Sequence, residues 1–173
     1  TVVATVMSNL GLHLFAREHG INVECTNVGD RNVLERMVEK DYAIGGEQSG
    51  HMIFRAYATT GDGQLTALQI LSLLERSGKP ASEIFGACVR CPQALVNVPV
   101  EGGNAAKEAI MAARWLRDAI AEREAKLAGK GRVLVRPSGT EALIRVMVEA
   151  SDHDEAACYA EELAALIKST KNI

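Results

Sequence analysis

The sequence lacks a surplus of either charge and lacks any long apolar run. Its 173 residues hold 19 Lys and Arg against 22 Asp and Glu, for a net charge of −3. These charges are scattered along the chain, so we expect no nucleic-acid partner that binds through bulk positive charge. No apolar run approaches the roughly 20 residues of a membrane-spanning helix, so we expect no membrane partner. The hydrophobic share of 47% suffices for a buried core.

Cysteine is also scarce, with residues at positions 25, 88, 91 and 158. Four thiols are too few for a disulfide framework in a chain of this length. Cys88 and Cys91 form a lone CxxC without a second pair or a nearby His, whereas a zinc site needs about four ligands. We therefore expect reduced thiols and a cytoplasmic location. The start, TVVATVMSN, has no secretory signal and no initiator Met, which indicates a segment of a longer protein.

Short β-branched runs alternate with amphipathic stretches over residues 1–78. The pattern predicts strands at 1–7, 21–25, 42–44 and 51–54, and helices at 10–19, 31–40 and from the turn at 59–63 to 77–78. Ser8-Asn9 and Asp30 are candidate caps for the first two helices. The order βαβαββα predicts an α/β fold, a mixed α/β domain with a mainly parallel sheet.

A second, smaller domain is predicted at residues 92–173, after a linker at 79–91. Strands are expected at 95–100, 132–135 and 143–149, and one long amphipathic helix at 104–127. Asp152 caps a closing helix that runs to about Lys168. The order β-α-β-β-α predicts an α+β domain whose sheet is flanked by helices on one side.

A polar, glycine-bearing loop, GGEQSGH, occupies residues 45–51 between two predicted strands. A hairpin needs one or two glycines for positive φ, but it does not need the polar side chains between them. Together those side chains offer carboxylate and amide acceptors, a hydroxyl and an imidazole, a mixture that suits vicinal sugar hydroxyls. The alternative is an ordinary polar hairpin tip. The candidate substrate-binding residues are Glu47, Gln48, Ser49, Gly50 and His51.

A second polar loop, RPSGTE, occupies residues 136–141, again between strands. Arginine offers a planar fork for two phosphate oxygens, serine and threonine add hydroxyls, and glycine lets the backbone approach an anion. An arginine on the next strand could add a second charge. The alternative is a turn with an exposed arginine, and the Walker spacing is absent. The candidate phosphate-binding residues are Arg136, Ser138, Gly139, Thr140 and Arg145.

The two loops resemble those of the α-D-phosphohexomutase family. Residues 46–51 look like its sugar-binding loop, and residues 136–141 look like its C-terminal phosphate-binding loop. The strings TVVATVMSNLGL, VGDRNVLERM, TTGDGQ, LVNV and LIRVMVE are similar to bacterial members. The resemblance covers essentially the whole chain. It implies that residues 1–78 correspond to the third of the family's four domains, and residues from 92 onward to the fourth.

This resemblance implies a mutase that interconverts glucosamine 6-phosphate and glucosamine 1-phosphate on the way to peptidoglycan precursors. The reaction runs through a phosphoserine and a glucosamine 1,6-bisphosphate intermediate. The family's T-x-S-H-N-P serine loop and its DxDxD magnesium loop do not occur in this sequence. We therefore expect the nucleophile and the Mg²⁺ ligands in N-terminal domains of the same enzyme, no catalytic or metal-binding residue here, and no activity of this chain alone.

Two alternatives stay open. Phosphomannomutase and phosphoglucomutase relatives have the same phosphate loop and a similar sugar loop, although Gln48 and the flanking strings favour glucosamine. A free-standing, non-catalytic phosphosugar-binding module would use the same two loops. If the chain is part of any of these mutases, we expect its two domains to close about the linker at 79–91.

Overall fold

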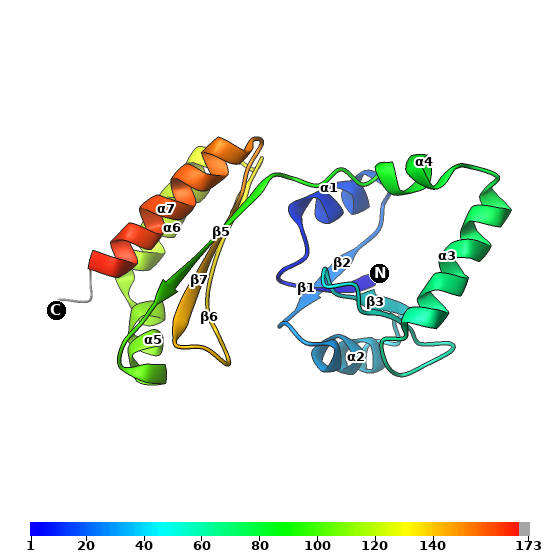
Figure 1. Cartoon of the computed structure of the whole chain (residues 1–173), viewed down its shortest axis with the longest axis horizontal. Coiled ribbons are helices and arrows are strands. Elements are labelled where there is room, and N and C mark those ends of the chain that lie inside the picture. Colours follow the sequence, from blue (N-terminus) through cyan, green and yellow to red (C-terminus); the bar gives the residue numbers. More distant parts are fainter. Residues whose placement is uncertain (170–173) are drawn as a thin grey trace. The chain divides into compact units, whose positions relative to one another are not determined.

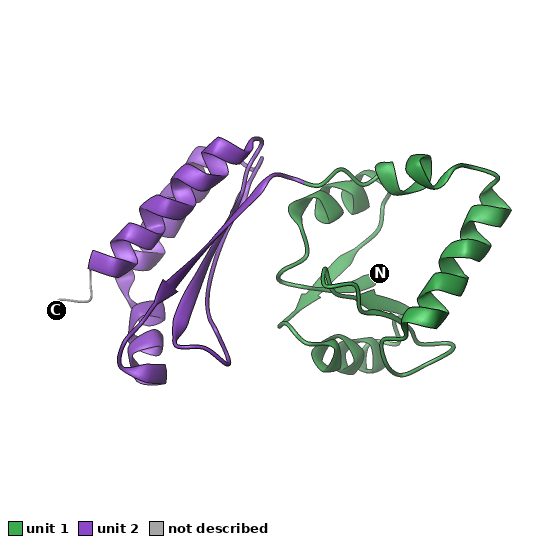
Figure 2. Ribbon diagram, in the orientation of Figure 1, with its two compact units in different colours: residues 1–90 green, residues 91–173 purple. Residues whose placement is uncertain are grey.

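The computed structural model describes residues 1–169 and divides the chain into two units, residues 1–90 and residues 91 onward (Figure 2). The first unit is a mixed α/β layer and the second is a smaller α+β layer, so the predicted fold class is confirmed. The stretch 79–91, expected from the sequence to be a linker, holds a short helix and lies almost wholly within the first unit.

The first unit follows the predicted βαβαββα order, with one short helix added at its end. Its sheet has the strand order β2-β1-β3-β4, in which β1 is parallel to β2 and β3, and β4 is antiparallel to β3. Its elements are β1 (Val2–Thr5), α1 (Leu10–Glu18), β2 (Val23–Thr26), α2 (Asp30–Glu39), β3 (Ile44–Gly46), β4 (Met52–Phe54), α3 (Gly63–Ser77) and α4 (Ala81–Gly86).

Helices α1 and α2 lie on opposite faces of this sheet (Figure 1). Val33 and Met37 of α2 are fully buried against the sheet. A Cβ atom on Gly45 would come within 2.6 Å of both of these side chains. β3 begins at Ile44 and ends at Gly46, so the strand predicted at 42–44 is placed two residues too early. Gly45 is a strand residue that lets α2 pack closely, not a turn residue.

Helix caps follow the sequence with one exception. Asn9 accepts a hydrogen bond from the Gly11 N–H, and Asp152 accepts one from the Glu155 N–H, both at 2.9 Å. Asp30 was expected to cap α2, but Gly29 occupies the cap position with φ of 124°. Asp30 is instead the first residue of the helix, where a carboxylate still interacts favourably with the helix dipole.

The second unit holds a three-stranded antiparallel sheet in the order β5-β7-β6. Figure 1 shows its helices on one face of the sheet, where they cover a single hydrophobic core. Its elements are β5 (Gln93–Pro99), α5 (Gly103–Ala112), α6 (Arg114–Leu127), β6 (Arg132–Pro137), β7 (Leu143–Glu149) and α7 (His153–Ser169).

The single long helix predicted at 104–127 is wrong, because the chain breaks it at Ala113. This residue has extended backbone angles, φ −65° and ψ 135°, and separates α5 from α6. No glycine or proline marks the break in the sequence. On the two sides of the break, α5 and α6 both contact β6, and Leu116 of α6 is buried in the core. Packing, not local propensity, therefore sets this boundary.

Candidate functional site

The first candidate loop forms the tip of the hairpin between β3 and β4. The Glu47 N–H donates to the His51 carbonyl at 2.9 Å, and the Gly50 N–H donates to the Glu47 carbonyl at 3.0 Å. Gly50 has φ of 102°, a conformation that residues with a side chain rarely adopt. This turn leaves Gln48 and Ser49 exposed at the tip. The five predicted substrate-binding residues therefore share one ordered turn.

The Glu47 carboxylate is held in place before any ligand arrives. Its side chain is only 10% exposed, and Oε1 accepts a hydrogen bond from the Gly29 N–H at 2.9 Å. Its Oε2 lies 3.7 Å from His51 Nδ1, and that same nitrogen is 3.0 Å from Ser49 Oγ. The loop thus presents a linked carboxylate, imidazole and hydroxyl. Such a chain of groups can bind sugar hydroxyls by donating and accepting together.

Gly29 is a residue that the sequence analysis did not connect to this site. It lies in the VGDR string, between β2 and α2, and nothing in the local sequence links it to the loop at 45–51. The structure joins it to the hairpin tip through Glu47, 18 positions further along the chain. The one available signal was that VGDR belongs to the strings that resemble bacterial family members.

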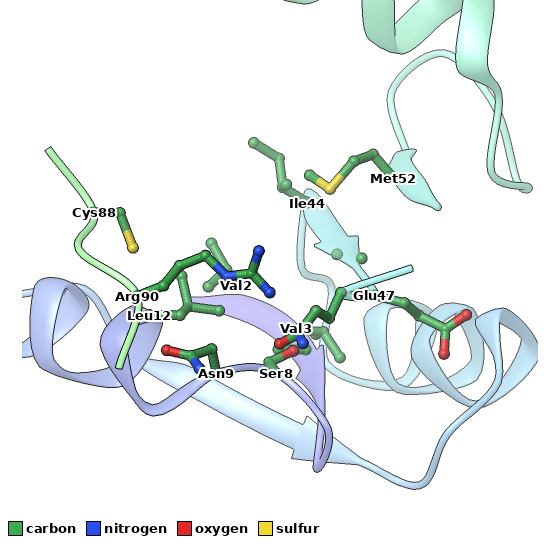
Figure 3. A pocket seen from close by; sticks show the side chains of 14 residues that line it. Val2, Val3, Ser8, Asn9, Leu12, Ile44, Glu47, Met52, Cys88 and Arg90 are labelled. Atoms are coloured by element: carbon green, nitrogen blue, oxygen red, sulfur yellow. The ribbon is translucent and has the colours of Figure 1, made fainter. Parts of the chain in front are cut away.

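A cavity of about 300 Å³ lies beside the hairpin, over the face of the sheet that carries α1. Figure 3 shows its lining side chains, which are mostly apolar and include Val2, Leu12 and Ile44. The Glu47 carboxylate points away from them. Glu47 and Gln48 of the loop lie at its edge, but its surface is largely apolar, whereas sugar hydroxyls need polar partners. We place the candidate sugar site at the exposed hairpin tip instead.

The second candidate loop joins β6 to β7 in the other unit. Val135, Ile144 and Val146 pack into the core under the helices. Since side chains alternate along a strand, Arg136 and Arg145 lie on the opposite, helix-free face. The two arginines are directly opposite each other in the strand register. Like charges in this position repel, which is typical of a site built for an anion.

The electrostatics of this arginine pair agree with an anion site. Burial lowers the pKa of the Arg136 guanidinium from its ordinary value, and the positive charge of Arg145 lowers it further. Arg145 donates from Nη2 to Glu141 Oε2 at 2.6 Å, while its buried Nε has no acceptor among the described residues. A phosphate oxygen would relieve the repulsion between the two side chains and could supply the absent acceptor.

The loop backbone is ordered by Ser138, which is only 3% exposed. Its N–H donates to the Leu143 carbonyl at 2.9 Å, and its hydroxyl accepts from the Glu141 N–H at 3.2 Å. The same hydroxyl lies 3.5 Å from a Glu141 carboxylate oxygen, to which it donates. Ser138 was predicted to offer a hydroxyl to phosphate, and that role stays a prediction. Within the loop its hydroxyl already stabilises the turn, whereas Thr140 is exposed.

Lys107 of α5 supports this loop and was missed by the sequence analysis. Its ammonium group donates to the Ser138 carbonyl at 2.7 Å and to the Glu141 carbonyl at 3.1 Å. The residue is 5% exposed. In the sequence it is one of many charged residues in the stretch 104–127, which predicts a long amphipathic helix. Only the fold shows that it faces inward.

Metal and membrane features complete the description of the two units. Within residues 1–169, no group of three or more His, Cys, Asp or Glu side chains is arranged to hold a metal ion. No helix in the same range is long and apolar enough to cross a membrane.

The chain consists of two α/β units, each with a polar, glycine-containing loop between two strands, and comparison with known families identifies this class of protein. Residues 1–91 match the model "Phosphoglucomutase/phosphomannomutase, alpha/beta/alpha domain III". Residues 95–166 match "Phosphoglucomutase/phosphomannomutase, C-terminal domain". The chain therefore belongs to the phosphoglucomutase/phosphomannomutase family and comprises its domains III and IV. The resemblance seen in the sequence is confirmed.

The curated relatives of this chain include several phosphoglucosamine mutases. The chain is 54% identical to the one from Caldicellulosiruptor saccharolyticus over 169 aligned residues. This alignment covers 98% of this chain and 37% of the relative. It is 52% identical to that of Novosphingobium aromaticivorans over 96% of this chain and 36% of the relative. The chain thus spans little more than a third of the length of these enzymes.

Solved structures with the same fold include fungal enzymes. N-acetylphosphoglucosamine mutase of Aspergillus fumigatus matches with a TM-score of 0.83 at 20% identity, over 99% of this chain and 39% of that one. The same enzyme in complex with GlcNAc-6P and magnesium matches with a TM-score of 0.82 at 20% identity, over the same shares of both chains. At such identities the likeness shows the fold.

Proposed function

We propose that this chain is the substrate-binding part of a phosphoglucosamine mutase that interconverts glucosamine 6-phosphate and glucosamine 1-phosphate. The observation that carries the proposal is the pairing of Arg136 with Arg145 across β6 and β7 beside an ordered, glycine-containing loop. The identity of about 50% to phosphoglucosamine mutases over nearly the whole chain supports the choice of substrate. The hairpin tip, called the sugar loop below, would bind the sugar. The loop at residues 136–141, called the phosphate loop below, would bind its phosphate.

The phosphate loop would hold whichever phosphate is not reacting. Arg136 supplies a planar fork, Arg145 a second charge, and Gly139 an open approach to the backbone. Ser138 and Thr140 would add hydroxyl contacts. A dianion placed there would remove the repulsion between the two guanidinium groups. Relief of this repulsion would thus contribute to the binding free energy.

The sugar loop must accept the hexose in two orientations, because the 1- and 6-phosphates exchange roles during the reaction. Glu47 and Ser49 would bind equatorial hydroxyls, which occupy similar places after the sugar turns over. Gln48 and His51 would complete the polar surface, with Gly50 shaping the turn. The fixed Glu47 carboxylate also suits the amino group of glucosamine. These contacts position the substrate and would contribute to the rate through orientation.

Bond-making is assigned outside this chain. We place the phosphoserine and the Mg²⁺ ligands in the other domains of the full enzyme, through which a glucosamine 1,6-bisphosphate would form and reorient. Ser49 and Ser138 belong to binding loops and are not proposed as nucleophiles. The 173-residue chain alone would therefore bind phosphosugar without isomerising it.

The test is a titration of the 173-residue chain, followed by amide resonances, with glucosamine 6-phosphate, glucosamine and inorganic phosphate. We expect glucosamine 6-phosphate to shift residues of both loops, glucosamine to shift only the hairpin tip, and phosphate to shift only residues 136–141. Shifts confined to other regions, or no shift with any ligand, would overturn the proposal. Glucose 6-phosphate is the control for the sugar, and tighter binding of it than of glucosamine 6-phosphate would overturn the substrate assignment.

A further inference from the structure

We infer that Lys107 is a positioning residue of the phosphate loop, residues 136–141. Its buried ammonium group places a positive charge on the side of the loop that faces α5. The inference rests on the proposed phosphate-binding function of residues 136–141. Lys107 lies on α5, on the helix-covered side of the sheet, whereas Arg136 and Arg145 lie on the open side. A phosphate at the loop would thus have cations on both sides of the sheet.

The burial of Lys107 is unusual for its residue type. Lysine is almost never buried without a charged partner, because removing an ammonium group from water is costly. Lys107 is 5% exposed, and among residues 1–169 it forms no ion pair with a carboxylate. Its two acceptors are the neutral carbonyls of Ser138 and Glu141. A buried cation that lacks a resident counter-ion is explained if an anion binds nearby.

The hydrogen bonds of Lys107 also orient the loop backbone. In a trans peptide the C=O and the following N–H point in opposite directions, and the described chain has no cis peptide. Because the Ser138 carbonyl points at Lys107, the Gly139 N–H points away from it. The Glu141 carbonyl likewise turns the Ala142 N–H away. Lys107 therefore draws carbonyls to the rear of the loop and leaves N–H groups facing the other way, as an anion site requires.

The loop itself would otherwise disfavour an anion. Carbonyl oxygens are partially negative, and Glu141 brings a full negative charge close to Arg145. By neutralising the two carbonyls, Lys107 removes one source of repulsion. The Lys107 ammonium would be separated from a bound phosphate dianion only by the loop backbone. At an effective dielectric of ~20, this attraction is expected to raise the affinity for phosphate by about tenfold or more.

The experiment compares Lys107→Met and Lys107→Gln with the unchanged chain in titrations with inorganic phosphate. Gln keeps a donor for one carbonyl without the charge, so it also serves if Met prevents folding. Lys126→Met is the matched control, because Lys126 is exposed and forms an i, i+4 pair with Glu122 on the same side of the unit. We expect phosphate affinity to fall about tenfold in both Lys107 variants and to stay unchanged in the control.

A second readout separates positioning from simple stability. In the folded Lys107→Gln variant, the dispersion of the core resonances should be retained while the Gly139 and Ala142 amides shift. In the full-length enzyme, Lys107→Gln should raise KM for the phosphosugar more than it lowers kcat. Wild-type affinity in a folded Gln variant would overturn the inference. Failure of the unchanged chain to bind phosphate would instead overturn the proposed function on which it rests.

Discussion

Replacing Arg136 by Met should make the second unit more stable and weaken its affinity for phosphate about a hundredfold. Arg136 faces Arg145 directly across β6 and β7, and its half-buried guanidinium has a lowered pKa because of burial first and Arg145 second. Both causes mean that the charged side chain is less favourable in the folded chain than in water. Methionine has a similar length and carries no charge, so the folded state loses this penalty.

The expected gain in stability is modest. A like-charged cross-strand pair costs up to about 1 kcal/mol, so the free energy of unfolding of Arg136→Met should rise by about 0.5–1 kcal/mol at low salt. The gain should shrink in about 1 M salt, where the Debye length is only ~3 Å. Urea denaturation followed by the fluorescence of Trp115 measures this, because Trp115 is the only tryptophan and packs against the core of the second unit.

The expected loss of binding is much larger. A bidentate arginine–phosphate contact makes two charge-assisted hydrogen bonds, each contributing about 1.5 kcal/mol or more. Losing both weakens phosphate binding by about 3 kcal/mol, which is roughly a hundredfold in Kd. Calorimetric titration with glucosamine 6-phosphate would measure this change. Stability and affinity should therefore move in opposite directions.

Arg145→Met is the matched control for the stability effect. It removes the same repulsion but also breaks the ion pair between Arg145 and Glu141, which contributes about 0–1 kcal/mol at a partly exposed site. The two effects should nearly cancel. If Arg136→Met is less stable than the unchanged chain at low salt, or binds the phosphosugar equally well, the reasoning from the arginine pair is wrong.

Three further changes test other contacts. Glu47→Gln should keep the hairpin folded but weaken glucosamine 6-phosphate binding by about tenfold, through loss of a charged acceptor, and a titration followed by the Gly29 amide resonance would show it. Arg132→Met should lower the free energy of unfolding by about 3–5 kcal/mol, because it removes a positive charge that lies 2.5 Å from the fully buried Glu149 carboxylate; an unchanged urea midpoint would contradict this. Ala128→Gly should raise the free energy of unfolding by about 0.5–1 kcal/mol, and with it the melting temperature. Ala128 ends α6 with φ of 48°, a conformation that glycine adopts more readily than alanine; a lower melting temperature would count against that conformation.

The local sequence determined the order of the elements and the chemistry of both loops. Caps such as Asn9 and Asp152, and the turn glycine Gly50, act over a few residues, so their effect can be read without knowing the fold. The same holds for the residue types gathered at 45–51 and 136–141. Their roles in binding stay predictions, because they depend on a ligand.

Only the tertiary structure decided the contacts that hold those loops in place. Gly29 meets Glu47 across 18 positions, and Lys107 meets Ser138 across 31. The break at Ala113 has no local signal, and the helices on its two sides, α5 and α6, both pack on β6. Hydrophobic periodicity reports which face of a helix is buried, but not which distant backbone it will meet. The sequence therefore gives Lys107 no assigned role, although in the fold its buried ammonium group binds two carbonyls of the loop at 136–141.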